Sequence, residues 1–188
     1  MVQKIITVRD MRKIIKKIIG KIDRWLNPQL SDLEIIKKHG VQYGENVHIY
    51  GHDFDLKYGP LLSIGNNVTV TYSKILLHDA SPSKFLDSNY GTKLKKVEIG
   101  NNVFIGYGSI ILPGTVIEDN VIVGAGTVVR GVVSSDSVIC GNPWQKVCSL
   151  AEYIERHKEK LGTAVKYDGN NFAAVARMLE EGNDVYIR

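Results

Sequence analysis

An aliphatic residue returns at every sixth position through the centre of the chain, and this spacing constrains the fold more than any other feature. The series consists of Ile99, Ile105, Ile111, Ile117, Val123 and Val129. Four positions after each of these comes a second small or β-branched residue: Val103, Ser109, Thr115, Val121, Thr127 and Val133. An α-helix repeats every 3.6 residues and a strand every two, so neither keeps a six-residue phase. The pattern predicts a solenoid of short flat segments, with three segments and roughly 18 residues in each coil.

A second repeat, of five-residue blocks, supports this coil length through the distances between the blocks. Four related pentads begin at Tyr43, Ile64, Ile99 and Ile117, and their starts are separated by 21, 35 and 18 residues. The last gap holds three hexads and therefore corresponds to one coil. Because a single coil cannot bury its own apolar edge, we expect several coils to stack around a narrow core.

Glycine and asparagine recur at fixed places in the repeats. Three glycines directly follow an aliphatic residue of the repeats: Gly100, Gly106 and Gly124. Three asparagines each come three positions after the aliphatic residue that begins a pentad: Asn67, Asn102 and Asn120. Both residue types tolerate positive φ and tight turns. We therefore expect them to form the corners of the coils.

The gap from Ile64 to Ile99 exceeds one coil by 17 residues, which predicts a long excursion. The six-residue phase runs through Leu76 and then breaks, so the excursion should leave just after His78 and return near Val97, spanning about 79–96. The first gap leaves a smaller excess of three residues, which we place around residues 53–60. Long loops in compact domains are usually functional or disordered.

The repeats divide the chain into three parts. Residues 1–40 form a predicted helical segment, residues 41–148 the repeat domain, and residues 149–188 a helical tail. The tail contains a capping box from Ser149 to Glu152 that opens a helix to about Leu161, and a second short helix that ends at Gly182. A short helix is also predicted from Ser31 to Lys38.

The first 24 residues carry a charge different from the rest of the chain. They contain eight Lys or Arg and two Asp, a net charge of +6, whereas the whole chain carries +4. Their apolar residues recur at steps of three and four, which predicts an amphipathic helix with a basic face. Two interpretations remain open: the helix packs on the main domain or a neighbouring subunit, or it lies on an anionic membrane surface.

Several classes of protein are disfavoured by the sequence. We expect no transmembrane helix, because no apolar run approaches about 18 residues, and no secretory signal. Cys140 and Cys148 suggest neither a disulfide framework nor a metal site. Nucleic-acid binding is not expected, because the basic segment lacks aromatic stacking residues. We predict a cytoplasmic protein, with the inner face of the membrane as its location if the basic helix binds lipid.

The stretch from Val97 to Val133, together with the later Gly141-Asn142-Pro143 and the pair His78-Asp79, resembles the hexapeptide-repeat acyltransferases. The similarity extends over about residues 41–160 and is greatest to the branch that acetylates sugars and surface polysaccharides. This resemblance implies a left-handed parallel β-helix and a homotrimer with active sites between subunits. It also implies transfer of an acetyl group from acetyl-CoA to a sugar hydroxyl without a covalent enzyme intermediate.

His78 is the candidate general base. An imidazole with a pKa near 6.5 suits removal of a hydroxyl proton at neutral pH, and the residue lies at the root of the excursion. Asp79 has three open roles: orienting the imidazole, contacting the acceptor or starting the turn. Asn89 matches a position where relatives carry an acidic residue that supports the histidine, and Asp53 and Asp87 are candidate acceptor-binding residues.

The resemblance also implies residues for the acyl donor. Tyr107 and Ala125 match positions whose backbone contacts the pantetheine arm, and Arg130 matches a position near it. Arg130 and Lys146 are candidate partners for the nucleotide phosphates. Trp144 replaces the usual alanine after Gly141-Asn142-Pro143. It either stacks on the adenine of the donor or fills the end of the prism that the stacked coils form.

Three alternative functions differ from O-acetylation of a sugar, and the first two belong to other functional classes. A zinc enzyme on the same scaffold would need His48, His52 and His78 to converge, which their spacing does not favour, so we expect no metal requirement. A non-catalytic β-helix scaffold would neither hydrolyse nor transfer from acetyl-CoA. An N-acetyltransferase acting on an amino sugar could use the same base.

Overall fold

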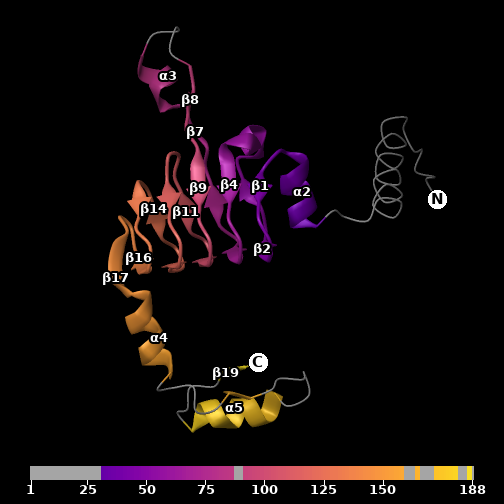
Figure 1. Ribbon diagram of the computed structural model, residues 1–188, viewed down its shortest axis with the longest axis vertical. Helices are drawn as coiled ribbons and strands as arrows, with labels where there is room; N and C mark the ends of the chain where they lie inside the picture. Colours follow the sequence, from indigo (N-terminus) through magenta and orange to yellow (C-terminus); the bar gives the residue numbers. More distant parts are fainter. Residues whose placement is uncertain (1–30, 87–90, 159–163, 166–171, 182–185, 188) are drawn as a thin grey trace, which may run out of the picture.

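Three parallel sheets form the faces of a three-sided stack of coils. The computed structural model describes residues 31–86, 91–158, 164–165, 172–181 and 186–187 (Figure 1). Face A contains β1 (Gln42–Tyr43), β4 (Leu62–Ile64), β9 (Val97–Ile99), β12 (Val116–Ile117) and β15 (Val132–Val133). Face B contains β2 (Val47–Tyr50), β5 (Val68–Thr71), β10 (Val103–Ile105), β13 (Val121–Val123) and β16 (Ser137–Cys140). Face C contains β3 (Asp53–Phe54), β6 (Lys74–Ile75), β11 (Ile110–Ile111) and β14 (Val128–Val129).

The pairing of the strands confirms the coil length predicted from the repeats. On face B, Val47 pairs with Val68, Val68 with Val103, and Val103 with Val121. These pairs have the 21-, 35- and 18-residue separations of the pentads. The excursions therefore lengthen the chain between neighbouring coils without shifting the register of the strands.

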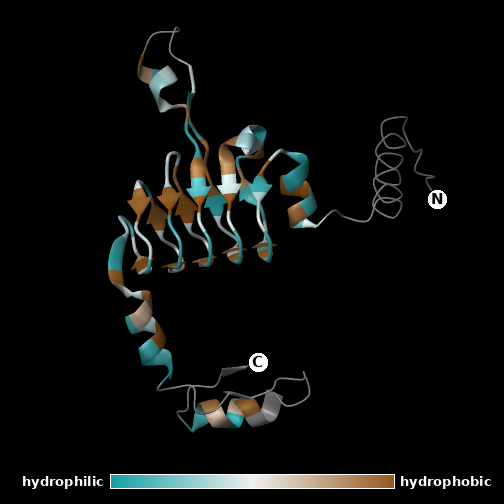
Figure 2. Ribbon diagram, in the orientation of Figure 1, coloured by the Kyte–Doolittle hydropathy of each residue, from teal (hydrophilic) through white to brown (hydrophobic). Residues whose placement is uncertain are grey.

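The core of the prism consists of the residues that keep the six-residue phase. Ile105, Ile111, Val123 and Val129 are completely buried, and Figure 2 shows hydrophobic residues recurring along the stacked strands. Burying each such side chain contributes roughly 1.5–3 kcal/mol. The second residue of each hexad is buried too, including Ser109, Thr115 and Thr127. Their hydroxyls donate to backbone carbonyls inside the prism, for example from Thr127 Oγ1 to the Gly124 oxygen at 2.6 Å, so these polar groups are satisfied.

Asparagines form one corner of the prism, as predicted. Asn46, Asn67, Asn102 and Asn120 all have φ between 53° and 60°. Their side-chain amides also bond from coil to coil, with Asn67 Nδ2 donating to Asn102 Oδ1 at 2.9 Å and Asn102 Nδ2 to Asn120 Oδ1 at 3.0 Å. The ladder joins successive coils along this corner.

Gly100, Gly106 and Gly124 stand at corners as expected, but they do not adopt positive φ. Positive φ occurs instead at other glycines, such as Gly108 and Gly126. The glycines that follow the aliphatic residues are required for space. A Cβ at Gly106 would lie 2.7 Å from the backbone nitrogen of Ala125 in the next coil, closer than real Cβ atoms approach.

We expect Gly65→Ala to lower the free energy of unfolding by about 1–3 kcal/mol. The added Cβ would lie 2.5 Å from the backbone oxygen of Gly100, and this oxygen cannot move without displacing the neighbouring coil. Gly91→Ala is the matched control, because a Cβ there would meet nothing within 4 Å. Chemical denaturation of the two variants checks this, and equal stability would show that the coils yield easily.

The predicted excursion leaves the prism between faces C and A. β7 (His78–Asp79) pairs in antiparallel fashion with β8 (Lys93–Leu94), and α3 (Ser81–Phe85) lies between them. Figure 1 shows this hairpin projecting from the stack of coils. The three residues by which the first gap exceeds one coil are accommodated in a 3₁₀ helix, η1 (Leu56–Leu61). This helix lies at the same corner of the preceding coil.

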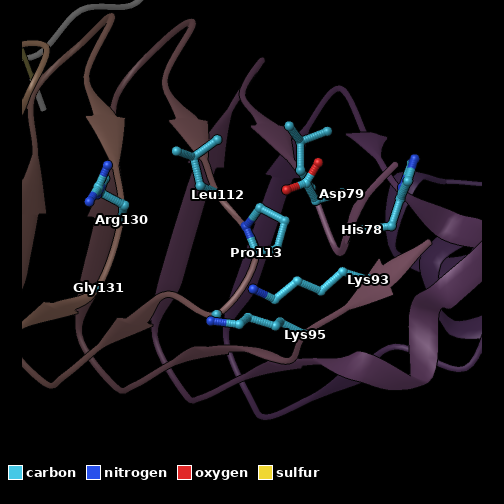
Figure 3. A pocket seen from close by; sticks show the side chains of 10 residues that line it. His78, Asp79, Lys93, Lys95, Leu112, Pro113, Arg130 and Gly131 are labelled. Carbon is cyan, nitrogen blue, oxygen red and sulfur yellow. The ribbon is translucent and has the colours of Figure 1, made fainter. Parts of the chain in front are cut away.

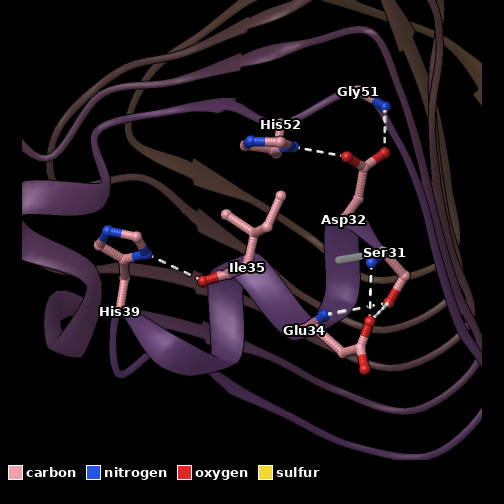
Figure 4. Close-up of polar contacts among 7 residues, drawn as sticks. All are labelled: Ser31, Asp32, Glu34, Ile35, His39, Gly51 and His52. Atoms are coloured by element: carbon pink, nitrogen blue, oxygen red, sulfur yellow. Dashed lines mark hydrogen bonds and ion pairs between the residues drawn. The ribbon is translucent and has the colours of Figure 1, made fainter. Parts of the chain in front are cut away.

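The helix α2 (Asp32–Lys38) covers the first coil and agrees with the predicted helix at residues 31–38. Its capping box joins Ser31 and Glu34 (Figure 4). Ile36 is completely buried. Asp32 accepts a hydrogen bond from the Gly51 backbone at 2.8 Å and one from His52 Nδ1 at 2.5 Å. Burial raises the pKa of Asp32, but the bonds from Gly51 and His52 outweigh this and hold it below its ordinary value of 3.8.

We expect Asp32→Asn to destabilise the protein by about 1–2 kcal/mol at pH 7, because hydrogen bonds to a charged acceptor are lost. The pKa of Asp32 is lowered in the folded state, so its contribution is present above about pH 3.8 and disappears as the pH falls through the folded-state pKa. Denaturation of the wild type and the variant between pH 3 and 7 checks this. A difference in stability that does not shrink toward the acid end would contradict it.

The chain beyond the last coil departs from the parallel arrangement. β17 (Gln145–Ser149) pairs in antiparallel fashion with β16, which the sequence did not indicate. The predicted capping box is confirmed, because Glu152 N donates to Ser149 Oγ at 3.2 Å at the start of α4 (Leu150–Lys158). The other elements are β18 (Ala164–Val165), α5 (Phe172–Glu180), which confirms the last predicted helix, and β19 (Tyr186–Ile187).

The basic segment at residues 1–24 lies outside the described residues, so both interpretations of it stay open. Among the helices that the structure does describe, none has the length and apolar character needed to cross a lipid bilayer.

Candidate active site

His78 lies at the corner between faces C and A, where the excursion begins. Leu77, directly before it, is completely buried in the prism, and this anchors the histidine at the end of a rigid coil. The imidazole is 36% exposed, so it can reach a bound molecule while its backbone stays fixed.

Asp55 holds the imidazole of His78, and sequence reasoning missed this residue. The Nδ1 atom of His78 bonds to the Asp55 carboxylate, whose side chain is 14% exposed. Asp55 lies one coil earlier, where its backbone nitrogen donates to the Ile75 oxygen at 2.9 Å. Its carboxylate also accepts from the Leu77 nitrogen at 3.2 Å. These contacts fix Asp55 before any ligand binds.

This hydrogen bond determines which nitrogen of His78 can act as a base. A carboxylate only accepts hydrogen bonds, so Nδ1 must carry the proton. In the neutral imidazole Nε2 then has a free lone pair. Tyr58 packs beside the ring, with the two ring centroids 5.4 Å apart, and restricts its rotation. His78 therefore has the arrangement of a positioned general base.

A groove of about 600 Å³ begins at His78 and crosses the corner of the next two coils (Figure 3). Leu112, Pro113 and Gly114 line it in the first of these coils, and Arg130 and Gly131 in the second. Three cationic side chains border the groove: Lys93 and Lys95, which sequence reasoning also missed, and Arg130. The groove can hold a molecule that extends along the axis of the coils from His78.

Asp79 also borders the groove, but it is not the partner of the imidazole. Its carboxylate accepts a hydrogen bond from the Ser81 nitrogen at 2.9 Å, which forms the turn into α3. The hydrogen bonds from Ser81 lower the pKa of Asp79 below its ordinary value. Of the three roles left open by the sequence, the contacts match the start of a turn. Asp87 and Asn89 lie outside the described residues.

Asp53 lies on the outer surface of face C. Its carboxylate forms an ion pair with Lys74 Nζ at 3.0 Å, and its side chain is 72% exposed. It is two residues from Asp55, but it does not border the groove at His78. Its role in acceptor binding stays a prediction.

Tyr107 and Ala125 occupy the corner between faces B and C, across face C from His78. They stand in successive coils, and the Gly126 nitrogen donates to the Tyr107 oxygen at 2.8 Å. Arg130, in contrast, lies at the corner that carries His78. The three residues predicted to contact the acyl donor therefore border face C, with Tyr107 and Ala125 at one edge and Arg130 at the other.

Lys146 and Trp144 lie near the end of the prism. Lys146 belongs to β17 and pairs with Ile139, so it is on face B and not beside the groove. The indole of Trp144 donates from Nε1 to the Arg130 oxygen at 2.9 Å and packs against the core. These contacts favour the interpretation that Trp144 fills the end of the prism.

The three histidines considered for zinc do not converge. His48 bonds to Asn46 at 3.0 Å, His52 to Asp32 and His78 to Asp55, each at a different place. Across the described ranges, no three His, Cys, Asp or Glu side chains are grouped to hold a metal ion.

The coils and the corner groove define a parallel β-helix protein with a candidate acid–base site. Comparison with known sequences agrees, because residues 96–131 match the family model described as bacterial transferase hexapeptide (six repeats). The protein CapG of Staphylococcus aureus is 40% identical over 143 residues, which cover 72% of this chain and 81% of that protein. The chain therefore belongs to the hexapeptide-repeat acyltransferase family, and its fold is the left-handed parallel β-helix.

Two further similarities are informative about the family. The galactoside O-acetyltransferase of Escherichia coli is 32% identical over 108 residues, 54% of this chain and 53% of that protein. A solved galactoside acetyltransferase in complex with coenzyme A shares the fold, with a TM-score of 0.51 and 22% identity over 76% of this chain and 84% of that one. The chain spans only between 51% and 58% of the length of several other curated relatives.

Proposed function

We propose that the protein transfers an acetyl group from acetyl-CoA to a hydroxyl of a sugar or of a cell-surface polysaccharide precursor. The observation that carries this proposal is the pairing of His78 with Asp55 at the mouth of the groove. A sugar hydroxyl is a weak nucleophile at neutral pH, so a positioned base is the group that such a reaction needs most. The names of several relatives, including a galactoside O-acetyltransferase, support the choice of the acetyl group and of a sugar acceptor.

In the proposed reaction, Nε2 of His78 accepts the hydroxyl proton while the sugar oxygen attacks the carbonyl carbon of the thioester. The tetrahedral intermediate then collapses and the carbon–sulfur bond breaks. The proton on Nε2 passes to the departing sulfur, which leaves as coenzyme A. Asp55 holds the ring and balances the charge of the imidazolium that forms between the two steps. The products are the acetylated sugar and the free thiol.

The same proposal places the donor along face C. Tyr107 and Ala125 border one edge of this face and Arg130 the other, so the pantetheine arm would lie across them toward His78. Lys146 lies on face B, and it contributes to this donor site only if a neighbouring subunit completes it.

We propose a homotrimer, because the groove is open on one side and a second prism would close it. Sedimentation or light scattering on the full chain should give three times the chain mass. A monomer that retains full activity would contradict this part of the proposal. Because the reaction depends on acetyl-CoA, we place it in the cytoplasm.

An acceptor screen that monitors free thiol tests the function directly. Thiol should appear only when acetyl-CoA and a hydroxyl-bearing sugar are both present, and mass spectrometry should find the sugar heavier by one acetyl group. Preferential acetylation of an amino sugar at nitrogen would instead support the N-acetyltransferase alternative, since the same base serves an amine. Complete inactivity with every acceptor would favour a non-catalytic scaffold.

A further inference from the structure

The groove beside His78 carries an excess of positive charge that the proposed acetyl transfer does not require. Lys93, Lys95 and Arg130 border it, against a single carboxylate, Asp79. The Asp79 carboxylate is already engaged by the Ser81 nitrogen. Among the residues that the structure describes, none of the three cations has a carboxylate within 4.0 Å. A cleft lined by one sign of charge attracts ligands of the opposite sign.

The two lysines are held in place by the strand that returns from the excursion. β8 pairs Leu94 with His78 and Lys93 with Asp79, and the Lys95 nitrogen donates to the Leu77 oxygen at 3.1 Å. Lys93 begins β8 and Lys95 directly follows its end, so in extended backbone both side chains lie on the same side of the chain. Both border the groove.

The aliphatic part of Lys95 is seated against the next coil. A Cβ at Gly114 would lie 2.6 Å from Cδ of Lys95, so the lysine passes directly over this glycine. Figure 3 shows Lys93 and Lys95 extending in the same direction, toward the part of the groove where Arg130 lies. The glycine thus leaves room for the lysine stem, and the two ammonium groups are presented within the groove.

The position of these charges relative to His78 favours the acceptor over the donor. The hydroxyl that reacts must come within about 3 Å of Nε2 of His78, so the acceptor lies beside this residue. In acetyl-CoA, the whole pantetheine arm separates the thioester from the phosphates. The lysines leave the backbone on either side of Leu94, the partner of His78 in the hairpin, and Lys95 reaches over Gly114 in the next coil. Arg130 lies one coil beyond that, about 10 Å from the coil of His78 at the usual strand spacing.

We infer that Lys93 and Lys95 bind an anionic group on the acceptor, a carboxylate or a phosphate ester, so that the substrate is an acidic rather than a neutral sugar. This inference rests on the proposed function and narrows its substrate class. An ammonium group forms charge-assisted hydrogen bonds with either anion, and a pair of them in the groove that begins at the base orients the sugar. The excursion thereby supplies both the turn that begins at His78 and the contacts that select the acceptor.

The test compares matched acceptors with and without charge. Acidic acceptors are glycosides of uronic acids and sugar phosphates, and each is paired with its neutral parent sugar. Lys93→Gln and Lys95→Gln are the variants, singly and together. Lys96→Gln is the matched control, because Lys96 adjoins Lys95 but does not border the groove. Acetyl-pantetheine replaces acetyl-CoA in a parallel series, because it lacks the phosphates of the donor.

We expect the wild type to acetylate an acidic acceptor with a higher kcat/KM than its neutral parent. Each lysine variant should lose on the order of tenfold in kcat/KM for the acidic acceptor, and little for the neutral one. The loss should persist with acetyl-pantetheine. Preference for glycosides of uronic acids would identify the group as a carboxylate, and preference for sugar phosphates would identify it as a phosphate.

Three results would overturn the inference. Equal use of acidic and neutral sugars, with no effect of the variants, would remove it and leave the acetyltransferase function intact. A loss that disappears with acetyl-pantetheine would show that the lysines bind the donor phosphates instead. Failure to acetylate any acceptor would contradict the proposed function itself.

Discussion

Replacing His78 with alanine should reduce kcat by a factor of order 10² or more, with a smaller change in the KM for acetyl-CoA. Among the residues described, His78 is the only imidazole that borders the groove, and its Nε2 lone pair is held in a fixed orientation by Asp55. Donor contacts lie elsewhere in the proposal, along face C, and they stay in place. The measurement is thiol release at saturating donor and acceptor, with acetylated sugar quantified separately.

The thermal midpoint of His78→Ala should remain close to that of the wild type. The imidazole is 36% exposed and makes no contribution to the core cluster. A variant that unfolds at a much lower temperature would show that activity was lost through the fold. Unchanged kcat in a well-folded variant would eliminate His78 as the base.

Replacing Asp55 with asparagine should also be severe, with a loss in kcat of about 10² or more and little change in either KM. The asparagine amide has nearly the same shape as the carboxylate but can donate a hydrogen bond to Nδ1. The proton of the neutral imidazole would then move to Nε2, where it blocks proton abstraction. Steady-state kinetics that separate kcat from KM measure this effect.

Two further variants show whether Asp55 acts through the tautomer of His78. Asp55→Ala should retain more activity than Asp55→Asn, because the alanine leaves Nδ1 free to keep its proton and bond to water. Glu98→Gln is the matched control, since Glu98 is an exposed carboxylate on face A, away from the groove. If Asp55→Asn is as active as the wild type, the hydrogen bond to His78 has no part in catalysis.

Most of the prism was predictable because its coils repeat a short physical requirement. Each coil must place aliphatic residues in the same narrow core, so residues such as Ile99, Ile111 and Val123 reveal the six-residue repeat in the sequence. The excursion followed from arithmetic, because the 35-residue gap exceeds one coil. The antiparallel strand β17 was not predictable, since it lies beyond the last repeat and pairs with only one strand.

The site was predictable only in part. His78 stood out because the six-residue phase breaks close before it, although the core position opposite Ile111 is taken by Ile75 and not by the expected Leu76. Asp55 lies in the preceding coil, next to the smaller insertion. A signal was present in the spacing: Phe54 pairs with Ile75, so Asp55 falls beside Leu76, two residues before His78. The three-residue insertion hid this relation, because it made the phase of the first coil uncertain.

Lys93 and Lys95 were overlooked for a different reason. Their sequence context, Thr92-Lys93-Leu94-Lys95-Lys96, is that of an ordinary solvent-exposed strand. Only the pairing of β8 with β7 brings them to the base. The close backbone approach at Gly106 was not predicted either, because its neighbour Ala125 belongs to the next coil and is distant in sequence.

The register of the coils is the same on both sides of the long excursion: Ile64 pairs with Ile99 as regularly as Ile99 pairs with Ile117. The pairing of the coils therefore does not depend on the length or sequence of the excursion between β6 and β9. Evolution, or a protein engineer, can therefore exchange the part of the excursion beyond Asp79 for one of another length or charge and change which substrate is selected, while His78 and Asp55 keep their places on the coils.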